Sequence, residues 1–274
     1  MEGDVGVRGV AVVTGASSGI GRAFAEHYAR EGHPLLLVAR REDRLRELAE
    51  RLGGEHGVEV GYTVADLATE EGMRTVRDAV DGVRALEIVV LNAGFGAAGR
   101  VAELSRERQT RMVVVNCAAV VDLAAHVLPR LVTQRNGTII VMSSAAAHQP
   151  IPETAVYAAT KAFDLHFAEA LADELRGSGV RAIASCPGPV PTEFGAVAGI
   201  SAASWLPPYT PDRVVRDTVR ALADGRVRVA AGPTAMITTV AARILPRRLV
   251  VWAAGEVHRR ALHATHGEGS HHGP

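Results

Sequence analysis

The chain alternates between short continuous apolar runs and longer amphipathic segments. Residues 10–13 and 35–38 are unbroken apolar runs, and each is followed by a segment with helical periodicity. A short unbroken run is typical of a strand that is covered on both faces of a parallel sheet. The alternation continues and predicts strands at residues 10–13, 35–38, 58–64, 86–91, 137–142, 180–185 and 226–231. Repeated units of this kind predict an α/β fold, a doubly wound parallel sheet with helices on both faces.

Helices are predicted between these strands from their periodicity and from the glycines that follow them. They cover residues 22–30, 42–52, 69–83, from beyond residue 101 to about 132, 153–176, and from beyond residue 211 to about 224. Gly32 ends the first, and Gly53 with Gly54 ends the second, because glycine commonly stands just past a helix. We find no linker and no internal repeat, so residues 1–232 are predicted to form one domain.

The first strand runs into a turn that contains three glycines. Gly15, Gly19 and Gly21 lack a Cβ atom, so the backbone can curl tightly and approach a pyrophosphate closely. The first N–H groups of the next helix have no intrahelical partner and carry the positive end of its dipole, which makes them an anion site. The spacing is G-x-x-x-G-x-G rather than the generic G-x-G-x-x-G, so a tight turn without a ligand remains the alternative for this motif alone.

Polar residues stand where the predicted strands end, the edge at which such sheets bind ligands. They are Ser17, Ser18, Arg40, Asp66, Asn92, Ser143, Ser144, Pro187 and Gly188. The second strand ends in Ala39, Arg40 and Arg41, without the acidic residue that contacts a ribose hydroxyl, and arginines there favour a 2′-phosphate. Two alternatives stay open, since Arg40 also fits a solvated charge and Asp66 also fits a helix cap.

Tyr157 and Lys161 are four residues apart in a predicted helix and therefore share a face. A free phenol has a pKa near about 10, and a nearby ammonium favours the phenolate. Lys161 is therefore predicted to lower the pKa of Tyr157. A shift of about 3 units corresponds to about 4 kcal/mol, which a partly desolvated cation can supply beside a bound, positively charged nicotinamide. Ser144 is placed to donate a hydrogen bond to a substrate oxygen while Tyr157 transfers a proton. An isolated Y-x-x-x-K pair would fit a surface helix better, but here the nucleotide turn and the serine precede it in order.

Composition limits the classes of function. The chain has 274 residues, of which 47% are hydrophobic, and this length suits one α/β domain with a sizeable core. Thirty basic residues balance thirty acidic ones, so no overall charge indicates a nucleic-acid partner. Cys117 and Cys186 are isolated in apolar stretches, which is typical of reduced core cysteines and predicts no metal site. The N-terminus lacks the pattern of a secretory signal and no uninterrupted apolar run reaches bilayer length, so a cytoplasmic location is predicted.

Taken as a set, five motifs resemble the series of the short-chain dehydrogenase/reductase family over about residues 7–232. They are T-G-A-S-S-G-I-G at 14–21, N-A-G at 92–94, S-S at 143–144, Y-A-A-T-K at 157–161 and P-G-P-V-P-T at 187–192. The resemblance implies a seven-stranded Rossmann-type sheet, often in homodimers or homotetramers, and NAD(P)-dependent interconversion of a carbonyl and an alcohol. Arg40 matches the position that selects NADP in many members, so NADP(H) is the predicted cofactor, with NAD(H) as the alternative.

The resemblance also implies roles for single residues. Tyr157 is similar to the acid/base, Ser144 to the substrate-orienting serine, Lys161 to the residue that tunes the tyrosine and holds the nicotinamide ribose, and Asn116 to the asparagine that holds a relay water. Asp66 would contact adenine, residues 92–94 the adenosine ribose, and Val190 and Thr192 the carboxamide. The implied cofactor set is Gly15, Ser17, Ser18, Gly19, Ile20, Gly21, Arg40, Asp66, Leu67, Asn92, Ala93, Gly94, Tyr157, Lys161, Pro187, Gly188, Val190 and Thr192. Leu91 and Ala147 depart from the family pattern, but neither touches a reacting group.

The substrate is less specified. Residues 193–209 correspond to the family's variable substrate loop, and Phe194, Ile200, Trp205 and Leu206 predict a hydrophobic alcohol or ketone. A loop that packs on its own body would look the same. A non-catalytic NADP-binding sensor is an alternative of another class, and the complete set of Ser, Tyr, Lys and Asn argues against it.

Residues 233–264 lie beyond the motif series, with helix candidates at 235–245 and from Pro246 onward. Arginines flank the apolar faces as in helices that lie on anionic lipid, namely Arg243, Arg247, Arg248, Arg259 and Arg260. An apolar stripe of Val250, Ala254, Val257 and Ala261 favours packing on the enzyme body or on a partner subunit. We expect an extension packed on residues 1–232, with peripheral membrane contact of a lipid-modifying reductase as the alternative. Residues 265–274, with His266, His271 and His272, are predicted to be a mobile tail rather than a metal site.

Overall fold

The computed structural model describes residues 8–199 and 209–267, and its centre is a seven-stranded parallel sheet in the order β3-β2-β1-β4-β5-β6-β7. The strands are β1 Val10–Thr14, β2 Leu35–Ala39, β3 Val60–Val64, β4 Leu86–Leu91, β5 Gly137–Met142, β6 Val180–Pro187 and β7 Arg228–Ala231. The chain moves outward from β1 to β3, returns to β4, and moves outward again to β7. This reversal leaves a crevice at the carboxyl ends of β1 and β4, where ligands of such sheets bind. The predicted fold class is confirmed.

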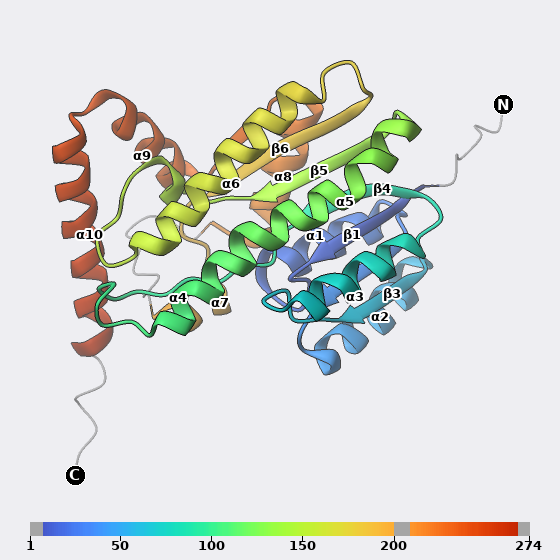
Figure 1. Ribbon diagram of the computed structural model, residues 1–274, viewed down its shortest axis with the longest axis horizontal. Coiled ribbons are helices and arrows are strands. Elements are labelled where there is room, and N and C mark those ends of the chain that lie inside the picture. The colour runs from blue at the N-terminus through green and yellow to red at the C-terminus, as the bar shows by residue number, and fades with distance from the viewer. Residues whose placement is uncertain (1–7, 200–208, 268–274) are drawn as a thin grey trace, which may run out of the picture.

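Helices cover both faces of the sheet (Figure 1). They are α1 Gly19–Arg30, α2 Glu42–His56, α3 Glu70–Asp81, α4 Arg106–Val113, α5 Ala119–Gln134, α6 Ala155–Glu174, α7 Glu193–Ala198, α8 Pro211–Ala223, α9 Pro233–Ile244 and α10 Arg247–Gly267. One apolar core lies between the sheet and α3, α5 and α6, and the other lies between the sheet and α1, α2 and α8. Because β1, β2, β4 and β5 are covered on both faces, their continuous apolar runs are explained.

Two helices differ from the sequence prediction. Helix α2 continues through Gly53 and Gly54 to His56, and it ends at Gly57, whose φ of 66° lies in the left-handed region. A glycine inside a helix costs only about 1 kcal/mol, so two of them did not stop it. The helix expected from beyond residue 101 to about 132 begins at Arg106 and contains a π-helical turn at Val114–Ala118. Such turns are frequent at functional sites, and this one contains Asn116.

The C-terminal extension forms the helices α9 and α10 at one end of the molecule (Figure 1). Ala235 and Val250 are buried, and a Cβ atom at Gly255 would lie 3.1 Å from Cγ of Pro152. Helix α10 runs to Gly267, so the first three residues of the predicted tail are helical, and residues 268–274 lie outside the described residues. Also outside are Ile200, Trp205 and Leu206 of the predicted substrate loop, and the side chains of Arg243, Val257, Arg260, Ala261 and His266.

One helical stretch of the described residues, Arg106–Gln134, is long and apolar enough to cross a membrane by length and composition. Its apolar side packs on the sheet, where Leu123, Val127 and Leu131 are buried in the core. The pattern is therefore also that of a central helix of a domain, and the cytoplasmic location stays a prediction.

Candidate active site

The turn after β1 and the segment after β4 form one hydrogen-bonded unit. Nδ2 of Asn92 donates to the carbonyl of Thr14 over 2.9 Å, and the Thr14 hydroxyl accepts from the N–H groups of Asn92 and Ala93 over 2.9 and 3.0 Å. Gly15 has a φ of 68°, and Gly21 packs so closely on the Gly15 carbonyl that no Cβ atom fits. These hydrogen bonds and this close packing hold the glycine turn and the N-A-G motif against each other. Thr14, which was not among the predicted site residues, links them.

A groove of ≈ 540 Å³ opens in front of this unit. It is lined by Ser17, Ser18, Gly19, Arg22, Ala23, Glu26, Arg44, Glu47, Leu48, Arg51, Pro191, Thr192, Glu193, Pro211 and Asp212. Ser18 is the N-cap of α1, yet its side chain makes no capping hydrogen bond, so the first N–H groups of this helix stay available for an anion. A turn with glycines at positions 15 and 19, an open helix N-terminus and the adjoining groove fit the pyrophosphate of a dinucleotide.

Arg41, rather than Arg40, reaches the phosphate end of this groove. Its Nη2 donates to Oγ of Ser17 over 3.0 Å, and its Nη1 donates to Glu193 over 2.8 Å. Arg44 donates to the other oxygen of Glu193 over 2.5 Å, and these two hydrogen bonds lower the pKa of Glu193 to about 2. Arg40 is exposed beside Asp66. Arg41 thus contacts residues that line the groove, and the specificity role expected of Arg40 stays a prediction.

Asp66 is engaged within the protein. Its carboxylate accepts from the N–H of Ala68 over 3.0 Å and from the guanidinium of Arg111. Partial burial opposes ionisation, but these hydrogen bonds outweigh it and lower the pKa of Asp66. The next predicted residue, Leu67, buries its side chain in the core, so only its backbone is available to a cofactor. The cap interpretation of Asp66 is wrong, because Thr69 caps α3 and Asp66 instead closes the turn before it through the N–H of Ala68. The adenine contact stays a prediction.

Lys161 is buried beneath the crevice. Its Nζ donates to the carbonyl of Met142 over 2.8 Å and to Oδ2 of Asp164 over 2.9 Å. The hydroxyl of Ser143 donates to the Lys161 carbonyl over 2.7 Å, which ties α6 to the end of β5. A Cβ atom at Gly94 would lie 3.5 Å from Nζ of Lys161, so the predicted catalytic and cofactor residues adjoin here. Burial opposes the ammonium, but Asp164 more than offsets it and the pKa of Lys161 is raised.

Tyr157 lies one helical turn before Lys161, and its ring centroid is 5.4 Å from that of Phe194 on α7. Burial raises the pKa of Tyr157, while the charge of Lys161 and a hydrogen bond with Ser144 lower it only in part. Desolvation of the phenolate therefore exceeds the attraction of a lysine that Asp164 already neutralises. The downward shift expected beside a bound, positively charged nicotinamide stays a prediction. Ser144 caps the 3₁₀ turn Ala145–His148, and its Oγ accepts from the N–H of Ala146 over 3.1 Å.

Asn116 is fully buried in the π-helical turn, and both polar atoms of its side chain are hydrogen-bonded. Its Nδ2 donates to the carbonyl of Phe95 and to Oγ1 of Thr160, each over 3.0 Å, and its Oδ1 accepts from the N–H of Phe95 over 3.1 Å. The side chain thus joins the segment after β4 to α6. Phe95 and Thr160 therefore supply the hydrogen-bond partners that this buried amide needs.

The remaining predicted residues border the groove from β6 and α7. Thr192 caps α7, and a Cβ atom at Gly19 would lie 3.2 Å from its Cγ2. The N–H of Gly188, just after Pro187, donates to the Ala231 carbonyl over 3.2 Å, and the side chains of Val190 and Ile20 pack against the core. These contacts bring the P-G-P-V-P-T motif over the start of α1.

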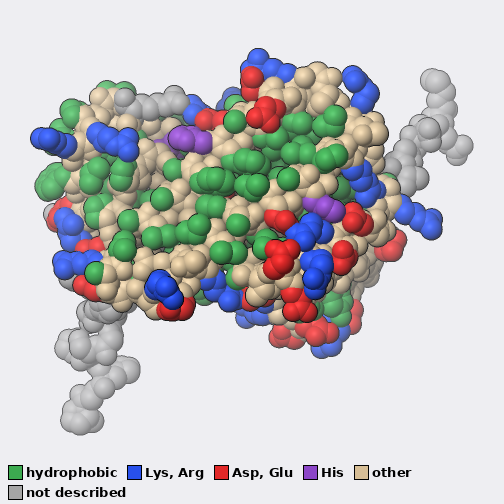
Figure 2. Space-filling model, in the orientation of Figure 1, with side chains coloured by type: hydrophobic (Ala, Val, Ile, Leu, Met, Phe, Trp, Pro, Cys, Tyr) green, Lys and Arg blue, Asp and Glu red, His purple; other side chains and the backbone are tan. Residues whose placement is uncertain are grey.

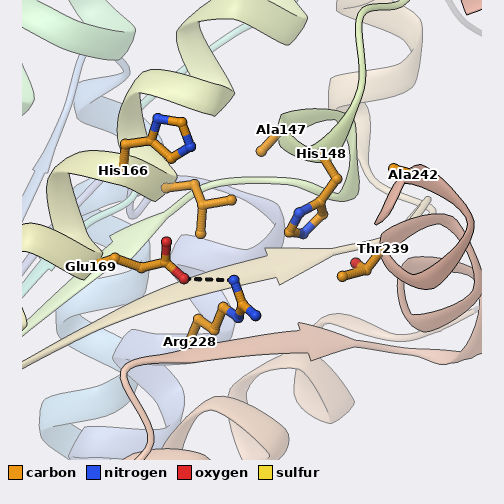
Figure 3. Close-up of a pocket in the computed structure, with 8 residues that line it drawn as sticks. Ala147, His148, His166, Glu169, Arg228, Thr239 and Ala242 are labelled. Atoms are coloured by element: carbon orange, nitrogen blue, oxygen red, sulfur yellow. Dashed lines mark hydrogen bonds and ion pairs between the residues drawn. The ribbon is translucent and has the colours of Figure 1, made fainter. Parts of the chain in front are cut away.

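A second cavity, of ≈ 270 Å³, lies on the other side of α6 (Figure 3). It is lined by Ala147, His148, Leu165, His166, Glu169, Arg228, Thr239 and Ala242. Glu169 accepts from Arg228 over 2.8 Å, and Figure 3 shows this pair at the floor below the two histidines. None of the predicted catalytic residues lines this cavity. In the described part of the chain, no three His, Cys, Asp or Glu side chains gather as metal ligands would.

Comparison with known proteins gives consistent matches. The short chain dehydrogenase family matches residues 9–199. Serine 3-dehydrogenase of Agrobacterium fabrum is 38% identical over 189 residues, which are 68% of this chain and 74% of that protein. The inactive hydroxysteroid dehydrogenase-like protein 1 of Pongo abelii is 31% identical over 253 residues, 91% of this chain and 76% of its own. A solved short-chain dehydrogenase from Sphingobium yanoikuyae in complex with NADPH has a TM-score of 0.77 and 33% identity, and the match covers 81% of this chain and 86% of that one.

Proposed function

Because the chain belongs to the short-chain dehydrogenase family, whose members are oxidoreductases, we propose that it interconverts a carbonyl and a secondary alcohol with NADP(H). The observation that carries the proposal is the placement of Tyr157 beside Ser144 and buried Lys161, whose ammonium adjoins Gly94 of the N-A-G motif. A proton donor, a hydrogen-bond donor and a cation in one place are what reduction of a carbonyl needs, since negative charge develops on its oxygen.

In the proposed reaction, the bound nicotinamide supplies the hydride for the carbonyl carbon, and the protein handles the proton. The phenol of Tyr157 donates its proton to the carbonyl oxygen, and the hydroxyl of Ser144 holds that oxygen in place. The ammonium of Lys161 stabilises the phenolate that is left behind. Asn116 is hydrogen-bonded to both the segment after β4 and α6. It therefore holds the N-A-G motif, which is proposed to contact the cofactor, at a fixed distance from the helix that carries Tyr157. Alcohol oxidation reverses each of these steps.

A hydrophobic substrate is proposed from the wall around Tyr157. The ring of Phe194 lies tilted by 48° over the tyrosine ring, and Ala198 is buried below it. Two hydrogen bonds hold helix α7 against the rest of the domain. The N–H of Ala98 donates to the carbonyl of Ala198 over 2.9 Å, and Nη2 of Arg108 donates to the carbonyl of Val197 over 2.6 Å.

A panel of aldehydes and ketones with NADPH, followed by loss of nicotinamide absorbance, tests the proposal. Turnover of apolar ketones by the full-length chain is expected. Tight NADPH binding without turnover of any carbonyl in the panel would contradict it and favour the sensor alternative.

We expect Arg40→Asp to abolish or reverse a preference for NADPH over NADH. A guanidinium pairs with a phosphate through two parallel hydrogen bonds, whereas an aspartate repels the 2′-phosphate and accepts from a ribose hydroxyl. The measurement is the ratio of kcat/KM for the two cofactors. Arg41→Asp is the matched variant, because Arg41 touches Ser17 directly. An unchanged ratio in Arg40→Asp with a changed ratio in Arg41→Asp would move the specificity role to Arg41.

We propose that residues 1–232 form the catalytic domain and that α9 and α10 pack on it through Ala235, Val250 and Gly255. The outer face is apolar and carries the exposed side chains of Met236, Ile237, Val240, Ile244, Leu249 and Trp252. Truncation after Gly232 is expected to cause aggregation or loss of activity, with no change in affinity for anionic vesicles. If the full-length chain binds such vesicles in a salt-sensitive way, while the truncated chain stays folded, active and unbound, the membrane interpretation replaces this one.

We also propose that the chain forms a homodimer or homotetramer. Hydrophobic side chains gather over α5 and α6 on the face shown in Figure 2, and Val113, Val121, Val132 and Phe163 are exposed on these helices and on α4. An exposed apolar patch of this kind marks a protein interface more often than free surface. Sedimentation of the full-length chain, compared with a Val121→Glu, Phe163→Glu double variant, measures the assembly.

A further inference from the structure

Asp164 is a buried carboxylate one turn beyond Lys161, and neither the motif series nor the proposed reaction assigns it a role. Its side chain is 1% exposed, against 7% for Lys161. Oδ2 accepts from Nζ of Lys161 over 2.9 Å, whereas Oδ1 has no hydrogen-bond partner among residues 8–199 and 209–267. A buried carboxylate with one unpaired oxygen lowers the stability of the folded protein, so we expect Asp164 to have a function that accounts for it.

Asp164 changes the charge of the catalytic cluster. The titratable groups that face it are Tyr157 and Lys161 from α6 and Cys117 from the π-helical turn. Burial raises the pKa of the Cys117 thiol to about 11, so that this group is neutral, and β5 contributes only the Met142 carbonyl. With a protonated phenol, an ammonium and a carboxylate, the cluster is neutral as a whole. Without Asp164 it would carry one buried positive charge.

We propose that Asp164 is a positioning residue that holds Lys161 in place and keeps the phenol of Tyr157 protonated at neutral pH, so that the site holds the proton that carbonyl reduction consumes and acts as a base only at higher pH. This inference rests on the proposed function and adds the residue that sets the pH range of its proton transfer. A carboxylate that neutralises the lysine weakens the attraction between the ammonium and the phenolate. Proton donation to a carbonyl requires the phenol, whereas alcohol oxidation requires the phenolate as the base.

The direction of the effect does not depend on which group loses its proton. Tyr157 and Lys161 are coupled, so their first deprotonation belongs to the pair. In the wild-type protein this step takes a neutral cluster to a net charge of −1, and in Asp164→Asn it takes a net charge of +1 to zero. Losing a proton from a buried positive cluster is easier, so the step must occur at lower pH in the variant.

The test compares pH profiles of kcat/KM for the wild-type enzyme, Asp164→Asn and Glu169→Gln. Glu169 is the matched control, because it is a carboxylate five residues further along α6 that pairs with Arg228 outside the site. In Asp164→Asn we expect the midpoint of the rise in alcohol oxidation to fall by about one pH unit, a modest shift for a nearby charge. The midpoint of the decline in carbonyl reduction should fall with it. Glu169→Gln should keep the wild-type midpoints.

A second readout needs no turnover. Tyrosinate absorbance of the cofactor-free wild-type protein is titrated against that of Tyr157→Phe, and the difference isolates Tyr157 from Tyr28, Tyr62 and Tyr209. The inference is supported if Tyr157 titrates well above neutral pH in the wild-type protein and its titration midpoint in Asp164→Asn is lower than in the wild-type protein. Titration at or below neutral pH in the wild-type protein, or unchanged midpoints in a folded Asp164→Asn, overturns it and leaves Asp164 a structural residue. Absence of turnover in the wild-type enzyme would reject the proposed function alone, because the absorbance titration still tests this inference.

Discussion

Tyr157→Phe is expected to lower kcat for carbonyl reduction at least a hundredfold while NADPH binding stays nearly unchanged. The substitution removes only the hydroxyl, and general acid catalysis contributes about 10²–10⁴-fold. The ring remains, so its packing on Phe194 should be kept. The groove that would hold the cofactor is lined by α1 and the turn before it, α2, residues 191–193 and the start of α8, and Tyr157 is not among its residues. Steady-state rates and a direct NADPH titration separate the two effects.

Tyr62→Phe is the matched control for this prediction. Tyr62 lies on β3 at the far edge of the sheet and is 36% exposed, so loss of its hydroxyl should leave the rate unchanged. Near-normal turnover in Tyr157→Phe would reject the acid/base role. A parallel loss of NADPH affinity would indicate that the phenol instead binds the nicotinamide ribose.

The sheet was predictable because its signal is local. Runs such as residues 35–38 are apolar without interruption, since β2 is buried on both faces, and their short length favours a strand over a buried helix. The order of β1 and β4 also follows, because the glycine turn and the N-A-G motif had to meet at a switch point. Strand ends were predicted within about two residues, which is the usual precision of such boundaries.

Three features of the structure differ from the sequence prediction, and each depends on contacts that the local hydrophobic pattern does not encode. Gly53 and Gly54 suggested a helix end, but α2 continued because Leu45, Leu48 and Leu52 anchor it on the core and Gly57 supplies the left-handed residue. The π-helical turn at Asn116 depends on contacts with Phe95 and Thr160, which are distant in sequence. The choice between Arg40 and Arg41 depends on which of two neighbouring side chains points at Ser17.

Within the candidate site, the sequence identified the residue types but not their electrostatic balance. The Y-x-x-x-K spacing placed a cation near Tyr157, and we predicted a lowered pKa from that pair and a bound nicotinamide, without a neighbouring carboxylate. Asp164 stands at the i+3 position from Lys161, a spacing at which side chains on a helix meet, so the ion pair was open to prediction. Its burial was not, because an acidic residue on a helix is usually exposed.

Lys161→Met is expected to abolish activity and to lower the free energy of unfolding by about 3–5 kcal/mol, the usual cost of removing one partner of a buried ion pair. The loss arises because the carboxylate of Asp164 would be left buried with neither oxygen paired. Urea denaturation of the cofactor-free protein measures it. The control is Arg176→Met, which breaks an ion pair of the same i,i+3 spacing with Asp173 whose side chains are 80% and 67% exposed. Exposed pairs contribute at most about 1 kcal/mol, so the control should stay near wild type.

Two further measurements separate charge from packing in this prediction. In Lys161→Met, burial raises the native-state pKa of Asp164 above its unfolded value, so the native state binds the extra proton between the two values. The destabilisation should therefore be smallest below the unfolded pKa and grow as pH rises towards the native pKa. In Lys161→Met, Asp164→Leu, where both charges are replaced by apolar side chains of similar size, most of the lost stability should return while activity stays absent. A double variant as unstable as Lys161→Met would show that packing of the lysine stem, and not the unpaired carboxylate, causes the loss.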